Sequence, residues 1–255
     1  MQNINPVFIL QPVVVIIIAS GLLIYWYYKR RFNPMVLVYS LVAYAVAIAL
    51  KSGVQSIPTN IVLNNVGLGV YYGLQTVIFE VGLAYFVAWY AISRGKLERK
   101  DAEAYGAGLA FWENAVLLGV LSLISLVAYY SVLSTNTPLA QTLYDKLNSI
   151  APAYFDPNSK ALQLVALGTL ERISSILAHS AWGYLCFVSV YLHKKRLFLI
   201  ALPMGFIDFL VPFEQNLGLP LFEAAVFALA VLSVLAAWYA TKQFRKKNEN
   251  KTSKS

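Results

Sequence analysis

The sequence predicts an all-α, polytopic membrane helix bundle with about seven transmembrane helices. Hydrophobic residues make up 59% of the 255 residues and charged residues only 13%, against about 25% charged residues in an ordinary soluble domain. The apolar residues also fall into long runs separated by short polar or basic segments. Such runs are expected when each one crosses a bilayer core of about 30 Å as a helix.

Seven apolar runs are interpreted as spans. The first ends in tyrosines, a tryptophan and the basic group Lys29 to Arg31, which is typical of a helix that stops at a membrane surface. The second and sixth runs are the shortest, and Lys51 closes the second. The predicted spans are residues 7–28, 35–50, 71–92, 105–132, 161–192, 197–213 and 220–241.

Most of the 20 lysines and arginines lie in four groups at span ends, within residues 29–31, 94–100, 194–196 and 242–254. Seven alternating spans place all four groups on one side, and the positive-inside rule makes that side cytoplasmic. We therefore predict a multi-pass protein of the cell membrane with its N-terminus outside and its C-terminus cytoplasmic. Residues 1–241 form the transmembrane domain and residues 242–255 a basic cytoplasmic tail. The lipid bilayer explains the net charge of +8, so nucleic acid is not expected as a partner.

Two connections between spans are long. The passage over residues 52–70, SGVQSIPTNIVLNNVGLGV, leaves open whether it holds a short interfacial or re-entrant helix. The segment from Ser134 to Lys160 contains three prolines and is predicted to be an exposed connection.

The segment from Gly168 to His193 is apolar enough to span a bilayer, yet it carries Glu171, Arg172 and His179. An ionisable group at a helix centre costs about 2.5 to 3.5 kcal/mol on insertion scales, so it normally faces the bundle interior. Glu171, Ser175 and His179 follow at i, i+4 and i+8, which places them on one face of the helix. We interpret that face as the wall of a buried polar site.

Ionisable residues of other spans have similar predicted depths. Counted from the cytoplasmic end of each span, the depths are about 12 Å for Glu113, about 17 Å for Asp208, about 18 Å for Glu80, about 20 Å for His179 and about 30 Å for Glu171 and Arg172. The first four therefore share one layer, and the last two are predicted near the outer surface. Any one of them could be an isolated packed or interfacial residue. A shared site explains the common depth more simply, because each buried carboxylate would otherwise need its own neutralising partner.

Three kinds of chemistry suit carboxylates and a histidine in a dry layer. A metal ion held by His179 and two carboxylates could activate water. A carboxylate base could activate water directly, with His179 orienting the water or stabilising an oxyanion. The same groups could also carry protons or ions across the membrane.

Four segments resemble, in order and spacing, the YhfC family of intramembrane metalloproteases, which is similar to type II CAAX prenyl proteases and PrsW proteases. They are VIFEVGLAYF at 77–86, AYGAGLAFWENAVLLG at 104–119, LERISSILAHSAWGYL at 170–185 and LPMGFIDFL at 202–210. The family pattern is Glu-Glu-x-x-Arg, then Gly-x-Gly-His-Gly-x-x-Glu, then Glu-Arg with a later His, then His-x-x-x-Asp. The matching residues are Glu80, Glu113, Glu171, Arg172, His179 and Asp208.

The resemblance implies hydrolysis of a peptide bond of a membrane protein or peptide at a polar site within the bilayer. Its candidate catalytic residues are Glu80, Glu113 and His179; the candidate supporting residues are Glu171, Arg172 and Asp208; and the candidate zinc ligands are His179, Glu113 and Asp208.

The sequence departs from the family pattern at Val81, Ala84, Leu109, Ala110 and Met204, which replace a glutamate, an arginine, a histidine, a glycine and a second histidine. Fewer histidines weaken a zinc site. An active member would therefore be a metallo- or a glutamic-type peptidase. The alternatives are a catalytically degenerate relative that binds or assembles membrane proteins or lipids, and a proton or ion transporter.

Overall fold

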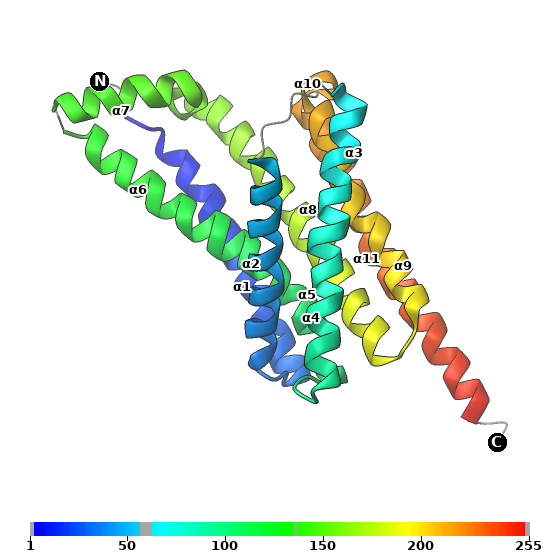
Figure 1. Cartoon of the computed structure of the whole chain (residues 1–255). Coiled ribbons are helices and arrows are strands. Elements are labelled where there is room, and N and C mark those ends of the chain that lie inside the picture. Colours follow the sequence, from blue (N-terminus) through cyan, green and yellow to red (C-terminus); the bar gives the residue numbers. More distant parts are fainter. Residues whose placement is uncertain (1–2, 57–62, 136, 253–255) are drawn as a thin grey trace.

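The computed structural model describes residues 3–56, 63–135 and 137–252, with side chains as far as residue 243. All of its regular elements are helices (Figure 1). Seven of the described helices are long and apolar enough to cross a membrane: Pro6–Arg30, Met35–Gln55, Asn65–Ser93, Arg99–Leu133, Asn158–Tyr191, Lys195–Leu217 and Leu219–Gln243. The predicted fold class and number of spans are confirmed, while the cytoplasmic position of the C-terminus stays a prediction.

The first three spans are longer than the apolar runs alone indicate. The first consists of η1 (Pro6–Ile9) and α1 (Leu10–Arg30), and the second is α2 (Met35–Gln55). The third consists of α3 (Asn65–Gln75), η2 (Thr76–Val81) and α4 (Gly82–Ser93). The polar passage over residues 52–70 therefore ends α2 and begins α3, and its residues 57–62 lie outside the described part. Lys51, which was predicted to close a span, lies inside α2.

The fourth span consists of η3 (Arg99–Asp101), α5 (Ala102–Phe111), η4 (Trp112–Val120) and α6 (Leu121–Leu133). The segment after it connects two spans, and most of its described residues are exposed, as predicted. Its interpretation as a loop is wrong. Helix α7 (Pro138–Ile150) and η5 (Pro152–Phe155) form there. Thr137 caps α7 with Pro138 in its first turn, and the helix buries Ala140 and Leu147. The prolines thus begin helices in this segment and do not mark a loop.

The last spans are α8 (Asn158–Tyr191), then α9 (Lys195–Gly205), η6 (Phe206–Phe213) and α10 (Glu214–Leu217), and finally α11 (Leu219–Thr252). Helix α9 contains Pro203, and the following 3₁₀ segment η6 contains Pro212. Proline donates no backbone hydrogen bond, so this span does not continue as a regular α-helix. The irregular segment carries Asp208.

Helix α8 lies at the centre of the bundle and packs against α5, α4, α9 and α11. Its contact with α5 depends on small residues. A Cβ atom added to Gly106 would lie 2.3 Å from the carbonyl oxygen of Ser180, and one added to Gly183 would lie 2.7 Å from the Cα of Gly106. Small residues let two membrane helices approach closely enough for dense packing. The buried C-terminal half of α8, including Trp182, Leu185 and Phe187, completes the main apolar core.

The chain enters and leaves the bundle at opposite ends (Figure 1). The N-terminus and α7 lie at one end, and the α1–α2, α4–α5 and α8–α9 connections lie at the other, where α11 also runs out towards the C-terminus (Figure 1). The basic groups of the sequence therefore lie at the same end of the structure. We call it the basic end.

Candidate active site

A pocket of about 160 Å³ lies between the helices, and we call it the central pocket. It contains all six predicted site residues, which come from four different elements. Its ionisable lining residues are Lys51 of α2, Glu80 of η2, Glu113 of η4, Glu171, Arg172 and His179 of α8, and Asp208 of η6. The four residues that were predicted at similar depths, Glu80, Glu113, His179 and Asp208, thus line one pocket.

His179 is the centre of this pocket. Its Nε2 lies 3.0 Å from Oε2 of Glu80 and 2.9 Å from Oε2 of Glu113. Its Nδ1 donates a hydrogen bond to the carbonyl oxygen of Ser175, one turn earlier, at 3.0 Å. The ring also lies against Trp182, with centroids 4.2 Å apart. Since Nδ1 faces a pure acceptor, the short contacts of Nε2 require a proton shared between the imidazole and the two carboxyl groups.

Glu113 is held by side chains of α8 at both of its carboxylate oxygens. The Ser175 hydroxyl donates to Oε2 of Glu113 at 3.0 Å and accepts a hydrogen bond from Nδ2 of Asn114 at 3.1 Å. Arg172 lies 3.8 Å from Oε1 of Glu113 and also forms an ion pair with Glu171. Arg172 therefore connects the partly exposed Glu171 with the buried cluster.

Glu171 and Arg172 were predicted to lie apart from the layer, near the outer surface. The structure brings both into the central pocket with the four residues of the layer, while their depth relative to a membrane surface stays a prediction. The fourth span begins at Arg99, not at residue 105, so Glu113 lies about 21 Å along its helix at 1.5 Å per residue. The long side chain of Arg172 covers the remaining distance to Glu113. Both Glu171 and Arg172 consequently line the central pocket.

Lys51 is the functional candidate that sequence reasoning missed. Its Nζ lies 2.5 Å from Oε1 of Glu80 and 3.3 Å from Oδ2 of Asp208, and its side chain is only 15% exposed. It also donates to the Thr76 hydroxyl at 2.8 Å, and this hydroxyl in turn donates to Asp208. An ammonium group among carboxylates at this depth supplies the positive charge that they need in a dry environment. The available signal was a lone lysine at the end of an unusually short predicted span.

Both central glutamates lie in helical segments that are wider than an α-helix. Glu80 belongs to the π-helical η2 and Glu113 to the π-helical η4. In a π-helical segment the backbone hydrogen bonds span five residues in place of the four of an α-helix. The extra residue shifts the direction of the side chains that follow, and such segments occur frequently at functional sites. Asp208 lies in the 3₁₀ segment η6. Three carboxylates of the pocket thus come from irregular turns inside membrane spans.

Zinc is implied by the family resemblance, so the fit of the pocket to a metal ion can be tested. In residues 3–56, 63–135 and 137–252, no group of three or more His, Cys, Asp or Glu side chains is arranged to hold a metal. Asp208, a predicted ligand with His179 and Glu113, is bonded to Thr76 and Lys51. Zinc requires several lone pairs directed at one point about 2.0 to 2.2 Å away. These side chains form a hydrogen-bonded and ion-paired cluster, and they do not fit a zinc site.

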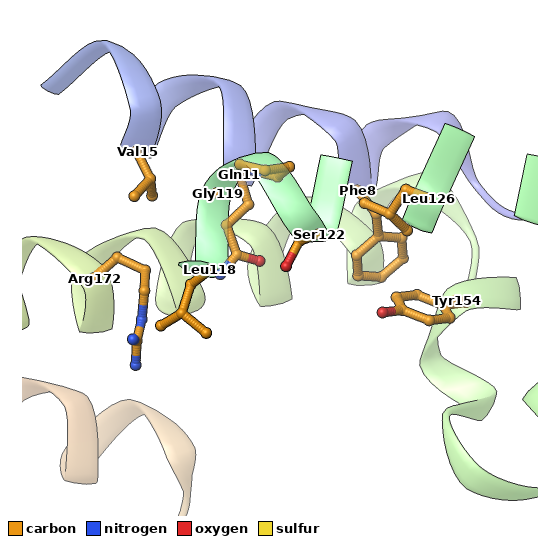
Figure 2. Close-up of a pocket in the computed structure, with 10 residues that line it drawn as sticks. Phe8, Gln11, Val15, Leu118, Gly119, Ser122, Leu126, Tyr154 and Arg172 are labelled. Atoms are coloured by element: carbon orange, nitrogen blue, oxygen red, sulfur yellow. The ribbon is translucent and has the colours of Figure 1, made fainter. Parts of the chain in front are cut away.

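A second pocket of about 220 Å³, which we call the outer pocket, lies between η1, α1, η4, α6, η5 and α8. Figure 2 shows its side chains, with Arg172 at one end and Tyr154 at the other. Gln11 and Ser122 supply further polar groups, and Phe8 and Leu126 supply apolar walls. Because Arg172 lines both pockets, the outer pocket adjoins the central one.

Comparison with known proteins supports the resemblance of the four motifs. The family model of the YhfC intramembrane metalloprotease matches residues 14–219. No curated protein and no solved structure matches the chain. The matched range covers most of the chain and includes every residue of the central pocket that the motifs predicted. The chain therefore belongs to the YhfC intramembrane metalloprotease family.

Proposed function

We propose that the protein is an intramembrane peptidase that hydrolyses a peptide bond of a membrane protein or peptide in its central pocket. The observation that carries this proposal is the position of His179, with Nε2 at hydrogen-bonding distance from both Glu80 and Glu113. A base that is oriented by a second group, with cations close by, is the arrangement that activation of water requires.

In the proposed reaction, Glu80 takes a proton from a water molecule, and the resulting hydroxide attacks the carbonyl carbon of the substrate. His179 shares the proton and passes it to the leaving nitrogen. Arg172 and Lys51 stabilise the negative charge that develops on the carbonyl oxygen, since cations act strongly where water is excluded. Glu113 and Ser175 position His179, while Asp208 and Thr76 position Lys51.

The substrate is proposed to be an extended segment of a membrane polypeptide that reaches the central pocket from the outer pocket. Gln11, Ser122 and Tyr154 offer donors and acceptors to its backbone (Figure 2). An unwound segment within a bilayer needs such partners, because each unpaired backbone group there costs several kcal/mol. Arg172, shared by both pockets, lies where the scissile bond would pass.

The test is to express the protein and its Glu80→Gln and His179→Ala variants in cells and to compare the membrane proteomes for shortened proteins. A matched control is Asp156→Asn, which changes a partly exposed acidic side chain outside the central pocket, paired with Lys160 at 3.1 Å. Products that appear with the native chain and the control, but not with the two site variants, would support the peptidase. Equal products from all four proteins would contradict it.

A second candidate is a catalytically degenerate relative that binds membrane proteins or lipids without cutting them. It is favoured by the residues that depart from the family pattern. Val81, Ala84, Leu109 and Met204 are at most 6% exposed and belong to the apolar core. This candidate predicts capture of a partner without any shortened product.

The family name implies a metal, and zinc held by His179, Glu113 and Asp208 is the alternative to Lys51 as the cation of the pocket. In the first alternative the positive charge of the pocket is on a metal ion beside His179, and in the second it is on the ammonium group of Lys51. The contact of Lys51 with Glu80 at 2.5 Å supports the lysine.

A further inference from the structure

A cavity with a charged rim lies at the basic end, on another face of α8 from the central pocket. It has a volume of about 590 Å³ and lies between α1, α5, α8 and α11. We call it the basic-end pocket. It shares no residue with the central pocket or the outer pocket, and the proposed peptidase reaction does not use it.

Positive charge exceeds negative charge around this pocket. Its lining includes Lys29, Arg30 and Lys242, against the single acid Glu103. Glu103 is already paired with Arg30 at 2.6 Å and with Arg99 at 3.6 Å. In the described part of the chain, no carboxylate pairs with Lys29, whose Nζ contacts the Tyr25 hydroxyl at 2.5 Å.

Lys242 likewise lies over an aromatic ring, 4.6 Å from the centroid of Trp238, and no described carboxylate pairs with it. An anion is therefore the chemical complement of the rim.

Three buried polar atoms of residues that line this pocket have no hydrogen-bond partner among the described residues: Nε of Arg30, Oγ of Ser180 and Oε2 of Glu103. The Glu103 oxygen has its counter-charge in Arg99, 3.6 Å away, which leaves the guanidinium nitrogen and the hydroxyl without a partner. Buried polar groups in native proteins are nearly always hydrogen-bonded. A ligand with several acceptor oxygens would satisfy the guanidinium, the hydroxyl and the ammonium groups of the rim together.

The remaining wall is apolar and aromatic. Trp26 and Trp238 face the pocket from α1 and α11, and Val234 and Ala237 extend the apolar surface along α11 towards the bilayer interior. Tryptophan is enriched at the level of lipid headgroups. A ligand that fits this wall has a negatively charged head and a hydrocarbon chain, which a soluble anion lacks.

We propose that the basic-end pocket binds an anionic glycerophospholipid, with its phosphate between Lys29, Arg30 and Lys242 and one acyl chain along α11. Basic pockets between membrane helices at the cytoplasmic side are typical of sites for anionic headgroups. A lipid bound there would contact α1, α8 and α11 together and would hold α11 against the other two helices.

The test uses the full-length protein in nanodiscs of phosphatidylcholine with a minor fraction of phosphatidylglycerol. Native mass spectrometry after transfer into mild detergent counts the phosphatidylglycerol that each protein retains. The test variant is Lys29→Gln with Lys242→Gln, both exposed and therefore compatible with folding. The matched control is Lys194→Gln with Lys195→Gln, which removes the same charge at the basic end but outside the pocket.

We expect the native chain and the control to retain phosphatidylglycerol in preference to phosphatidylcholine, and the test variant to retain at least about tenfold less. Equal loss in the control would show attraction to the surface charge alone and would overturn the proposal. Addition of inorganic phosphate separates the two sources of this anion. Displacement of the lipid by millimolar phosphate would identify a free-phosphate site and would also overturn it.

Discussion

The central pocket and the basic-end pocket hold their charges in opposite ways. In the central pocket every cation contacts a carboxylate: Lys51 pairs with Glu80 and Asp208, and Arg172 pairs with Glu171. Among the three cations that line the basic-end pocket, Lys29 and Lys242 contact aromatic rings, and only Arg30 has an acidic partner among the described residues.

Depth explains this difference. A charge in the middle of a bilayer has neither water nor headgroups beside it, so the protein itself must supply the counter-charge. A charge at the end of a helix can reach the headgroups and water. The pairing inside the central pocket is therefore a condition of stability there, while the excess charge at the basic end is available for a ligand.

Removing one partner of the central cluster is expected to have the largest effect. Lys51→Met leaves Glu80 and Asp208 without their shared cation, and breaking a buried ion pair in this way costs about 3 to 5 kcal/mol. The unfolding midpoint in detergent, followed by circular dichroism or intrinsic tryptophan fluorescence, should fall strongly.

Lys195→Met, which removes an exposed lysine at the basic end, is the control and should leave the midpoint almost unchanged. If Asp208→Asn is added to Lys51→Met, part of the loss should be recovered, because one unpaired charge is removed. An unchanged midpoint for Lys51→Met would mean that this lysine does not neutralise the cluster.

The helix contact between the two pockets should give the next largest effect. Gly106→Ala places a Cβ 2.3 Å from the Ser180 carbonyl oxygen and 2.8 Å from the Tyr184 nitrogen, so α5 and α8 must move apart. Overpacking of this kind costs about 1 to 3 kcal/mol. Gly21→Ala is the control, since its Cβ meets no atom within 4 Å, and it should keep or slightly raise the unfolding midpoint. Equal midpoints for the two variants would argue against close packing of α5 and α8.

The smallest effect is expected from a hydrogen bond inside the central pocket. Ser175→Ala removes the hydroxyl that donates to Glu113 at 3.0 Å, at a cost of about 1 kcal/mol. Ser149→Ala removes an exposed hydroxyl on α7 and serves as the control. In the cleavage assay, Ser175→Ala should slow product formation without abolishing it. A complete loss would give Ser175 a direct part in the reaction.

The sequence predicted the number of spans because long apolar runs and basic ends are direct consequences of the bilayer. It also predicted that Glu80, Glu113, His179 and Asp208 meet. The fixed rise per helical residue converts the position of each residue in its span into a depth, and these four depths are similar. The residues that line the pocket with them were harder to predict. Lys51 was interpreted as the end of a span because a lysine after an apolar run usually lies at the surface.

Irregular backbone explains the other differences. Three irregular segments change the direction of side chains: the π-helical η2 and η4 and the 3₁₀ segment η6. In a span that is apolar on all sides, the pattern of hydrophobic residues does not show where such a segment begins or ends. Helix α7 was missed because its prolines were interpreted as loop signals, although Pro138 occupies the first turn of a helix, where proline is favoured. In both cases tertiary contacts decided between conformations that the local sequence left open.

The central claim is that Lys51, and not a metal ion, supplies the positive charge of the central pocket. It is tested most directly by elemental analysis of the detergent-purified protein, native and His179→Ala, after dialysis against micromolar zinc and then against metal-free buffer. The account predicts far less than one zinc per chain in both proteins. About one zinc per chain in the native protein, lost in His179→Ala, would contradict it and would establish a metal centre at His179.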